Sequence, residues 1–372
     1  MRVALVSDWF PPRVGGMESQ LLGLMYALEG LGHQVDVITS FPGEDQIGPH
    51  RIVRIPTRRL PMSYVALPVG LSGPLRSVLA PGRHDLVHVH LSSVTPFSFA
   101  ALKHAALLGL PTAITMHSLS PGAVEFLKWM RKFGYFDPEK TPVSVVGPKL
   151  ARQASRLVDG TEVTILSNGI DYGFWAENAE QSVNRQAGSF VISTVMRLEW
   201  TKRPWALARI LRNLRDRGVD AQLEVAGSGT FRSSIMRQAQ RLGVADHLAL
   251  RGWKTPNDLR DILARSDVFL SPSTREAFGI AALEARAAGL PVVARSGTGI
   301  SEFIRDGRDG IMCNSDRKME NALVELAARG SKLASMRGLR PELQRYDWPV
   351  IARRHLDFYE LAGATSDLAS AV

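Results

Sequence analysis

Residues 1–39 read MRVALVSDWFPPRVGGMESQLLGLMYALEGLGHQVDVIT, and they already indicate the class of fold. Val3–Val6 form one continuous apolar run and Val35–Thr39 form another. The segment between them predicts a helix with a single apolar stripe, because apolar side chains recur there at spacings of three and four residues. Gly32 is placed to end this helix. The stripe consists of Met17, Leu21, Leu24, Leu28 and Leu31. A strand, a helix and a strand in this order predict a parallel sheet covered by helices.

Further runs rich in Val and Ile continue this alternation along the chain. Most are unbroken, as expected of strands buried on both faces of a parallel sheet. The runs are Leu86–Val89, Thr112–Met116, Val163–Leu166, Val191–Val195, Leu223–Ala226, Val268–Leu270 and Val292–Ala294. The alternation pauses in a polar stretch after Phe174 and restarts at Phe190. We therefore expect an α/β fold with one Rossmann-like domain at 1–174, a linker at 175–188 and a second Rossmann-like domain at 189–345.

The composition is that of an ordinary globular protein with basic character. The chain has 372 residues, which favours two domains, and a formal net charge of +9 at pH 7, which favours anionic partners. A single cysteine, Cys313, excludes an internal disulfide framework and fits a reducing compartment. No unbroken apolar stretch is long enough to predict a transmembrane helix.

A glycine pair follows the first predicted strand. Gly15 and Gly16 come after a loop that contains Pro11 and Pro12, and they open the first helix. Glycine lets the backbone approach a ligand closely, and a helix N-terminus favours an anion. A plain loop with a glycine at the helix start is the alternative. The pattern is not the dinucleotide fingerprint, because no third glycine stands at the required spacing.

Two cations follow the strand at Val191–Val195. Arg197 and Lys202 are five residues apart at the exit of this strand, where both can reach one diphosphate. Arginine offers a bidentate fork and lysine a point charge. The alternative is that both are ordinary solvated surface cations.

The most specific motif follows the predicted strand at Val268–Leu270. Glu276 lies in the loop after the strand, and a helix around Phe278–Ala288 is expected to contain Glu284. The two carboxylates are spaced to bind hydroxyl groups at both ends of a nucleotide sugar, with the diphosphate at the helix N-terminus between them. The alternative is one capping and one solvated glutamate. The backbone amides expected to face the diphosphate are those of Phe278, Gly279 and Ile280.

Smaller signals also follow predicted strands. His117 stands at a strand end, where α/β sheets place their ligands; a structural histidine is the alternative. His88 and His90 alternate on one strand, but a metal site needs a third ligand and the sequence indicates none, so no metal site is expected. The turn at 168–171 and the loop at 227–229 are weaker signals of ligand binding.

Taken together, these motifs resemble the retaining glycosyltransferases of family 4, which have the GT-B fold. The resemblance runs from Val3 to about Tyr359 and includes a late segment, beginning Tyr346-Asp-Trp348, that in the family is a helix crossing back to the N-terminal domain. It implies two Rossmann-like domains that face each other across a cleft, with residues 346–372 as the returning helix and tail. The motifs that keep the family's order are Gly15-Gly16, His117, residues 168–171, Arg197 with Lys202, and Glu276 with Glu284.

The resemblance implies a role for each candidate residue. Arg197 and Lys202 would neutralise the diphosphate of the leaving nucleotide, and Gly16 would lend it a backbone amide from the opposite domain. Glu276 would hold hydroxyl groups of the transferred sugar, and Glu284 would hold the ribose of the nucleotide.

The resemblance also assigns His117 to the sugar, near the reacting carbon. Three positions depart from the family pattern. Met196 and Arg203 stand where family members often have glycine, and Ser228 stands where an acidic residue is frequent.

The expected function is transfer of a hexosyl unit from a GDP- or UDP-linked sugar to an acceptor hydroxyl, with retention at the anomeric carbon and with no cofactor or metal. The acceptor is expected to be a lipid or a cell-envelope glycan precursor, because the strings at 7–12 and 115–118 are similar to those of phosphatidylinositol N-acetylglucosaminyltransferases and mannosyltransferases. The alternatives are an epimerase or phosphorylase on the same fold, or a nucleotide-sugar binder without catalysis. No nucleic-acid partner is expected, because no helix-turn-helix, zinc or aromatic RNA-binding motif is present.

Basic and aromatic residues of the first domain favour an anionic membrane surface as a further partner. We therefore expect a cytoplasmic protein that is peripheral on the inner face of the membrane; a solvated face over core residues is the alternative. The basic residues are Arg51, Arg54, Arg58, Arg59, Arg76 and Arg83. A second group interleaves Phe126, Leu127, Trp129, Met130, Phe133 and Phe136 with Lys128, Arg131 and Lys132.

Overall fold

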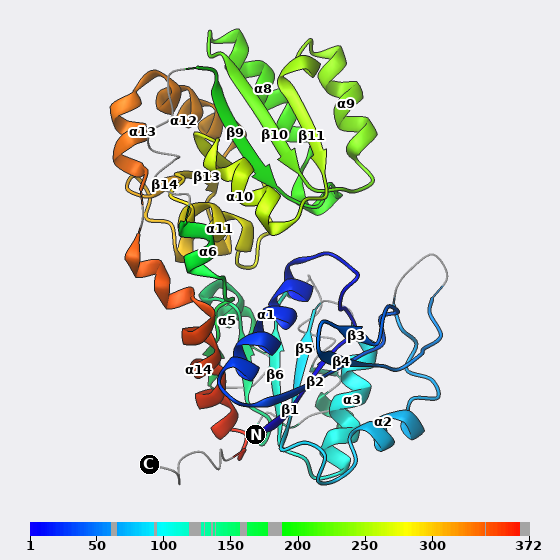
Figure 1. Ribbon diagram of the computed structural model, residues 1–372. Helices are drawn as coiled ribbons and strands as arrows, with labels where there is room; N and C mark the ends of the chain where they lie inside the picture. The colour runs from blue at the N-terminus through cyan, green and yellow to red at the C-terminus, as the bar shows by residue number, and fades with distance from the viewer. Residues whose placement is uncertain are drawn as a thin grey trace. The chain divides into compact units, whose positions relative to one another are not determined.

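The chain divides into two compact units (Figure 1). Unit 1 consists of residues 1–169 and 346–372, and unit 2 consists of residues 170–345. The computed structural model describes residues 1–60, 65–92, 95–118, 128–129, 131–134, 137, 139–156, 162–177, 188–338 and 340–364. The chain therefore leaves unit 1, builds the whole of unit 2 and returns to unit 1 at its end.

Unit 1 is built on a sheet whose strands follow the order β3-β4-β2-β1-β5-β6-β7-β8. All neighbouring strands pair in parallel except β3 and β4, which form an antiparallel edge. The strands are β1 (Arg2–Ser7), β2 (Gln34–Thr39), β3 (Gln46–Ile47), β4 (His50–Arg54), β5 (Leu86–Leu91), β6 (Thr112–Met116), β7 (Val143–Val145) and β8 (Val163–Ile165).

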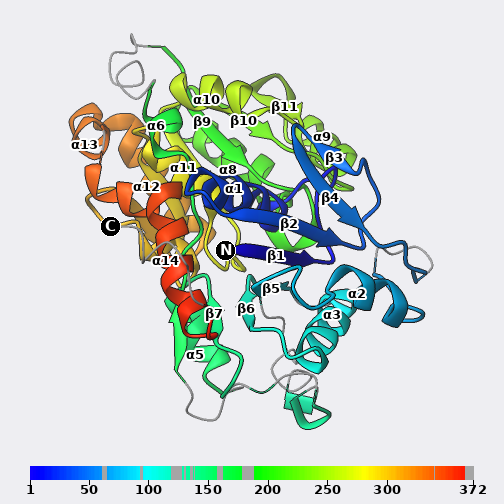
Figure 2. The same cartoon turned by 60° about the horizontal axis from the view of Figure 1, so that its bottom comes forward.

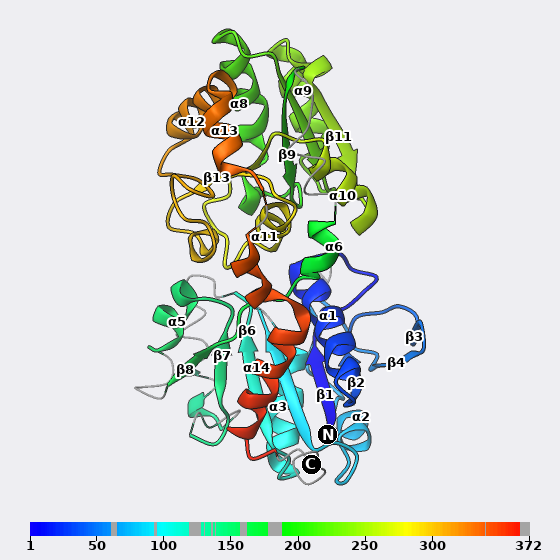
Figure 3. The same cartoon turned by 60° about the vertical axis from the view of Figure 1, so that its left-hand side comes forward.

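Helices cover both faces of this sheet (Figure 3). Helices α1 and α14 lie side by side on one face and share a core with β1 and β2, whereas α3 packs against β1, β5 and β6 on the other face, as right-handed crossovers require. Helix α2 packs against α3 (Figure 2). The contact of α14 with α1 confirms the predicted return of the C-terminal helix. The helices are α1 (Gly16–Gly30), α2 (Ser72–Val78), α3 (Pro96–Leu107), α5 (Pro148–Ala154) and α14 (Trp348–Glu360).

Unit 2 is built on a fully parallel sheet with the strand order β11-β10-β9-β12-β13-β14. The strands are β9 (Phe190–Val195), β10 (Ala221–Ala226), β11 (Leu248–Gly252), β12 (Val268–Ser271), β13 (Val292–Arg295) and β14 (Gly310–Cys313). Buried residues of α8, α9 and α12 form its main core with this sheet. The helices are α6 (Tyr172–Ala176), α8 (Trp205–Asp216), α9 (Arg232–Arg241), α10 (Pro256–Ala264), α11 (Ile280–Ala287), α12 (Asp316–Ala328) and α13 (Gly330–Met336).

Every strand predicted from the sequence is present, and the prediction of two Rossmann-like parallel sheets is confirmed. The prediction missed β3, β4, β7, β11 and β14; of these, β3 and β7 have only two and three residues, and β4 carries two arginines. The helix predicted around Phe278–Ala288 was placed too early. Helix α11 begins at Ile280, because Gly279 has a φ of 98° and cannot continue a right-handed helix. Residues 178–187 of the predicted linker lie outside the described part of the chain.

Each sheet has one topological switch point, where successive crossovers leave in opposite directions. In unit 1 it lies between β1 and β5, and in unit 2 between β9 and β12. Ligands of open α/β sheets bind at the carboxyl ends of the strands that flank such a point. The glycine pair follows β1, the cations follow β9 and the glutamate motif follows β12, so the sequence motifs gather at the two places where the topology favours a ligand.

Candidate active site

Lys202 and Glu276 meet at the switch point of unit 2. Lys202 Nζ donates a hydrogen bond to Glu276 Oε2 over 2.6 Å, and each side chain keeps 21% of its surface exposed. The two residues come from the loops after β9 and β12, which are 74 positions apart in the sequence. A half-buried cation and carboxylate in direct contact form a polar centre that can exchange its internal partner for an incoming ligand.

The glutamate loop is held by backbone contacts with the loop after β13. The amide of Gly299 donates to the carbonyl oxygen of Glu276 over 2.9 Å. A Cβ atom at Gly299 would lie 2.0 Å from the carbonyl oxygen of Ala277, so only glycine allows this approach. The position of Glu276 is therefore fixed by backbone geometry rather than by its ion pair alone.

The residue after Lys202 is fixed by a second ion pair. Arg203 adopts the left-handed conformation, with a φ of 55°, which is unusual for a residue other than glycine. Its guanidinium donates two hydrogen bonds to Asp316, of 2.9 and 2.8 Å, and Asp316 also accepts one from Arg295. The hydrogen bond from Arg203 lowers the pKa of Asp316. This bidentate contact compensates for the backbone strain at the position where the sequence departs from the family's glycine.

Arg197 is more exposed than Lys202 and Glu276. Its side chain is 42% exposed, and its only ion pair among the described residues is a long one to Glu199, at 3.6 Å. Arg197 and Lys202 follow the same strand, as predicted. Arg197 therefore presents a guanidinium that a ligand can reach without breaking a tight ion pair.

The loop at 227–229 supports the cation loop. A Cβ atom at Gly227 would lie 1.9 Å from the carbonyl oxygen of Met196, and one at Gly229 would lie 2.5 Å from that of Leu198. Leu198 donates a backbone hydrogen bond to Ser228. The two glycines thus serve close packing between neighbouring loops, a role that the sequence pattern did not reveal.

The start of α11 differs from the prediction in detail. Phe278 is 2% exposed and its ring lies 5.5 Å from that of Phe303, while Gly279 precedes the helix and Ile280 is its first residue. Farther along the helix, burial raises the pKa of Glu284 to about 8. The two glutamates therefore differ: Glu276 is held in an ion pair, whereas burial disfavours the charged form of Glu284.

In unit 1 the glycine pair opens α1 as predicted. Gly16 is the first helical residue, and a Cβ atom at Gly15 would lie 2.4 Å from the carboxylate of Glu18. Glu18 is buried and paired with Arg13, whose guanidinium lies over the ring of Trp9. The loop before the helix is therefore held by an ion pair that leaves no room for a side chain at Gly15.

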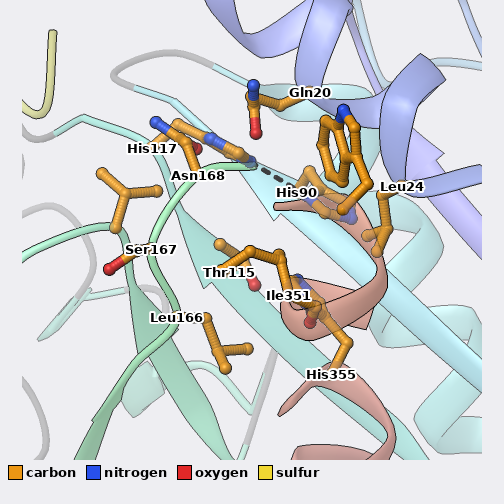
Figure 4. Close-up of a pocket in the computed structure, with 12 residues that line it drawn as sticks. Gln20, Leu24, His90, Thr115, His117, Leu166, Ser167, Asn168, Ile351 and His355 are labelled. Atoms are coloured by element: carbon orange, nitrogen blue, oxygen red, sulfur yellow. Dashed lines mark hydrogen bonds between the residues drawn. The ribbon is translucent and has the colours of Figure 1, made fainter. Parts of the chain in front are cut away.

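A small pocket lies between α1, α14 and the ends of β5 and β6 (Figure 4). It leaves room for about one water molecule. Its lining residues are Gln20, Leu24, His90, Thr115, His117, Val146, Leu166, Ser167, Asn168, Trp348, Ile351 and His355. The pocket thus brings together His117 and Asn168, two residues that the sequence singled out.

His117 is paired with another histidine. Its Nε2 lies 2.9 Å from Nδ1 of His90, and the two rings are stacked. Burial lowers the pKa of His117 to about 3 and holds that of His90 well below its ordinary value. Both imidazoles are therefore neutral near pH 7. The partner was not predicted, although the alternation of His88 and His90 placed a second ring on the correct strand.

The turn at 168–171 joins α1 and α14. Gln20 and Gly169 exchange two hydrogen bonds, of 2.7 and 2.8 Å, between the Gln20 amide and the Gly169 backbone. A Cβ atom at Gly169 would lie 2.5 Å from the ring of Trp348, and one at Gly23 would lie 2.0 Å from it. Through these contacts the first turn of α14 packs closely against α1.

Some of the arginines predicted to form a basic surface hold loops through hydrogen bonds instead. Arg54 donates to the carbonyl oxygens of Phe41 and Glu44, and Arg59 to that of Ser40, so these two arginines hold loops. Trp129 and Phe133 are 51% and 56% exposed, with ring centroids 4.5 Å apart. Within the described residues, no helix is long and apolar enough to cross a membrane. Phe126, Leu127, Met130 and Phe136 lie outside the described part of the chain.

Two family models match consecutive parts of the chain. The model "Glycosyltransferase Family 4" matches residues 14–174, and "Glycosyl transferases group 1" matches residues 176–335. Together the two matches contain the predicted site residues from Gly15 to Glu284.

Relatives match the chain over nearly its whole length. An uncharacterised glycosyltransferase of Methanocaldococcus jannaschii is 27% identical, over 97% of this chain and 98% of its own. A phosphatidyl-myo-inositol mannosyltransferase of Propionibacterium freudenreichii is also 27% identical, over 98% and 96%. The structure of HepE from Anabaena, in complex with UDP and glucose, has a TM-score of 0.76 and 15% identity, over 96% of this chain and 99% of its own. This likeness shows the same fold.

Proposed function

We propose that this chain, which belongs to the family 4 glycosyltransferases, transfers a hexosyl unit from a GDP- or UDP-linked sugar to an acceptor hydroxyl with retention of anomeric configuration. The observation that carries the proposal is the contact of Lys202 with Glu276 at the switch point of unit 2, with the accessible Arg197 also in the segment after β9. A cationic pair next to a carboxylate matches a ligand that has a diphosphate at one end and sugar hydroxyls at the other.

The barrier of such a transfer is charge separation at the anomeric carbon. The bond from this carbon to the diphosphate oxygen breaks, the bond to the acceptor oxygen forms on the same face, and the acceptor proton passes to the departing phosphate. Lys202 and Arg197 stabilise the negative charge that develops on the leaving group, which is electrostatic preorganisation. When the diphosphate binds Lys202, Glu276 is released from its ion pair and can accept hydrogen bonds from sugar hydroxyls.

The remaining candidate residues take supporting roles in this proposal. Glu284 binds the ribose hydroxyls, the amides at the start of α11 face the diphosphate, and Gly15 and Gly16 supply further backbone donors. His117 contacts the sugar. Its neutral imidazole suits a hydrogen bond with a hydroxyl or ring oxygen better than a role as a permanent cation.

For the acceptor we propose a lipid or a cell-envelope glycan precursor. The mannosyltransferase of Propionibacterium freudenreichii, which matches the chain over nearly its full length, is named for a phosphatidyl-myo-inositol acceptor. The exposed rings of Trp129 and Phe133 are adjacent to basic residues, a combination that suits the surface of an anionic membrane. Flotation with vesicles that contain or lack anionic lipid tests this part: association is expected only with anionic lipid, and equal recovery with both contradicts it.

A donor panel tests the central proposal. GDP- and UDP-linked hexoses are screened for thermal stabilisation, and those that bind are incubated with lipid extracts, with the anomeric configuration of the product read by NMR. Transfer with retention is expected. Binding of the donor with neither transfer nor hydrolysis would favour the non-catalytic binder. Release of a free sugar epimer would favour the epimerase.

A further inference from the structure

His90 is a buried histidine with one free ring nitrogen. It is 1% exposed, Nδ1 faces His117 Nε2, and Nε2 is shielded from solvent without a hydrogen-bond partner among the described residues. Whether this nitrogen carries a hydrogen decides which way the hydrogen bond to His117 runs. The direction of that bond in turn decides what His117 can offer to a ligand.

The neighbouring histidine cannot satisfy His90, because both of its nitrogens are occupied. His88 Nδ1 lies 2.9 Å from the Tyr359 hydroxyl, and Nε2 lies 2.7 Å from Thr115 Oγ1. Thr115 contacts Ser144, which donates to the carbonyl oxygen of Ile114. One direction satisfies every donor: Tyr359 donates to His88, His88 to Thr115, and Thr115 to Ser144. This series of hydrogen bonds ends at the carbonyl oxygen of Ile114 and does not include His90.

Two arrangements of the histidine pair remain. If His117 donates to His90, the hydrogen of His90 must sit on Nε2, as a buried donor without an acceptor. If His90 donates to His117, only a lone pair on Nε2 is unmatched. Buried N–H groups without a partner are rarer in folded proteins than acceptors with an unmatched lone pair. The second arrangement is therefore favoured.

We propose that His90 is a positioning residue that donates to Nε2 of His117 and thereby holds His117 in the Nδ1–H form, so that His117 offers a hydrogen-bond donor to an oxygen of the bound sugar. Nδ1 of His117 makes no hydrogen bond within the described part of the chain, and the ring lines the small pocket. The second half of this inference rests on the proposed function; the first half, the direction of the hydrogen bond, does not.

The surroundings keep the pair neutral. The rings that face His90 and His117 are those of His88 and His355. Burial lowers the pKa of His355 to about 4 and holds that of His88 well below its ordinary value. The other groups that face the cluster, Thr115 and Tyr359, carry hydroxyls, and burial raises the pKa of Tyr359. No charged partner among the described residues is thus in place to convert His117 into an imidazolium.

Nitrogen-15 NMR of the ligand-free protein tests the direction of the hydrogen bond. Histidine is labelled, and the His117 signals are assigned by their loss in His117→Asn. We expect a protonated Nδ1 and an unprotonated Nε2 on His117 near pH 7. A protonated Nε2 would overturn the inference and would leave the proposed function untouched.

Two substitutions of His90 test the consequence for catalysis. His90→Phe keeps an aromatic ring but removes the donor, so we expect kcat to fall about 10-fold or more, as for the loss of a fixed donor, with the affinity for the nucleoside diphosphate unchanged. His90→Asn retains an amide donor at the place of Nδ1 and should restore most of the lost kcat. His84→Asn is the matched control: His84 is also a buried histidine, 5% exposed, but it pairs with Asp36.

The outcomes separate the two proposals. A changed His117 tautomer together with reduced kcat in His90→Phe, and recovery in His90→Asn, supports the inference. Normal kcat in His90→Phe, with the wild-type tautomer as proposed, overturns the claim that the donor matters. Absence of transfer by the wild type with every nucleotide sugar contradicts the proposed function, and the tautomer result then stands alone.

Discussion

Both units place polar residues at the switch point of their sheet, but the two groups of residues differ in charge and in burial. Unit 2 uses full charges in pairs that stay partly exposed, such as Lys202 with Glu276. Unit 1 uses neutral rings: His90, which is 1% exposed, lies beside the half-buried His117. Charges near water keep their hydration and can be exchanged for a ligand's charges at little cost, whereas a neutral imidazole keeps a fixed tautomer only where water does not compete.

This contrast predicts where each kind of substitution acts. Removing a charge in unit 2 should affect the anionic leaving group, and disturbing the packing in unit 1 should affect stability first.

Lys202→Ala should have the largest effect. We expect turnover to fall at least about 100-fold, because a donor aimed at developing negative charge is lost. Initial rates at saturating donor measure it. Lys332→Ala is the control, since Lys332 also forms an ion pair, with Glu325 between α12 and α13, and should leave turnover unchanged. Near-normal turnover of Lys202→Ala would contradict the proposal that the charge of Lys202 stabilises the leaving group.

Gly23→Ala should destabilise unit 1 by about 1–3 kcal/mol. Alanine normally favours a helix, but a Cβ atom at Gly23 would lie 2.0 Å from the ring of Trp348 and would overpack the contact of α1 with α14. Gly30→Ala in the same helix is the matched control, because nothing lies within 4 Å of its Cβ position, and it should be neutral or stabilising. Urea unfolding gives both values. Equal stability of the two variants would contradict the packing argument.

Glu284 predicts a pH dependence of stability. Its pKa is raised to about 8 in the folded protein, so between the unfolded value near 4.5 and pH 8 the folded state retains a proton that the unfolded state has released. The contribution of Glu284 to stability is therefore full below pH 4.5 and is lost as the pH rises to 8, at about 1 kcal/mol per pH unit. Glu284→Gln removes this dependence. Thermal unfolding of both proteins at pH 5 and pH 8.5 measures the difference, and parallel pH profiles would contradict it.

Arg203→Gly should have the smallest effect. Glycine relieves the left-handed backbone but loses the bidentate pair with Asp316, so the two changes in stability nearly cancel, to within about 1 kcal/mol. Asp316→Asn weakens the pair and keeps the strain, so it should be the less stable variant. Nucleoside diphosphate should bind a few-fold more weakly to both, measured by calorimetry, because the loop of Lys202 is less fixed. A Gly variant less stable than the Asn variant would show that strain is unimportant here.

Patterns along the sequence predicted the sheet strands and the charged motifs, because continuous Val and Ile runs and motif spacing are local properties. Arg197, Lys202 and Glu276 were predicted as candidate site residues in this way. The partners were not: Asp316 is 113 positions from Arg203, and His90 faces His117 only because β5 and β6 are neighbours in register. Gly299 likewise matters through a backbone contact that no periodicity encodes. Long-range pairing, left-handed φ angles and hydrogen-bond direction are properties of the folded chain.

The discontinuity of unit 1 has a consequence for how the protein is made. Ala352, Phe358 and Tyr359 belong to the core that α1 and the first strands share, yet they are translated after all of residues 170–345. While the chain emerges from the ribosome, unit 2 can complete its own core. Residues 1–169 of unit 1, however, lack the contacts with α14 until that helix has been translated. A helix that is translated after unit 2 thus completes the unit that was translated first, and termination of translation before α14 would leave the core of unit 1 incomplete.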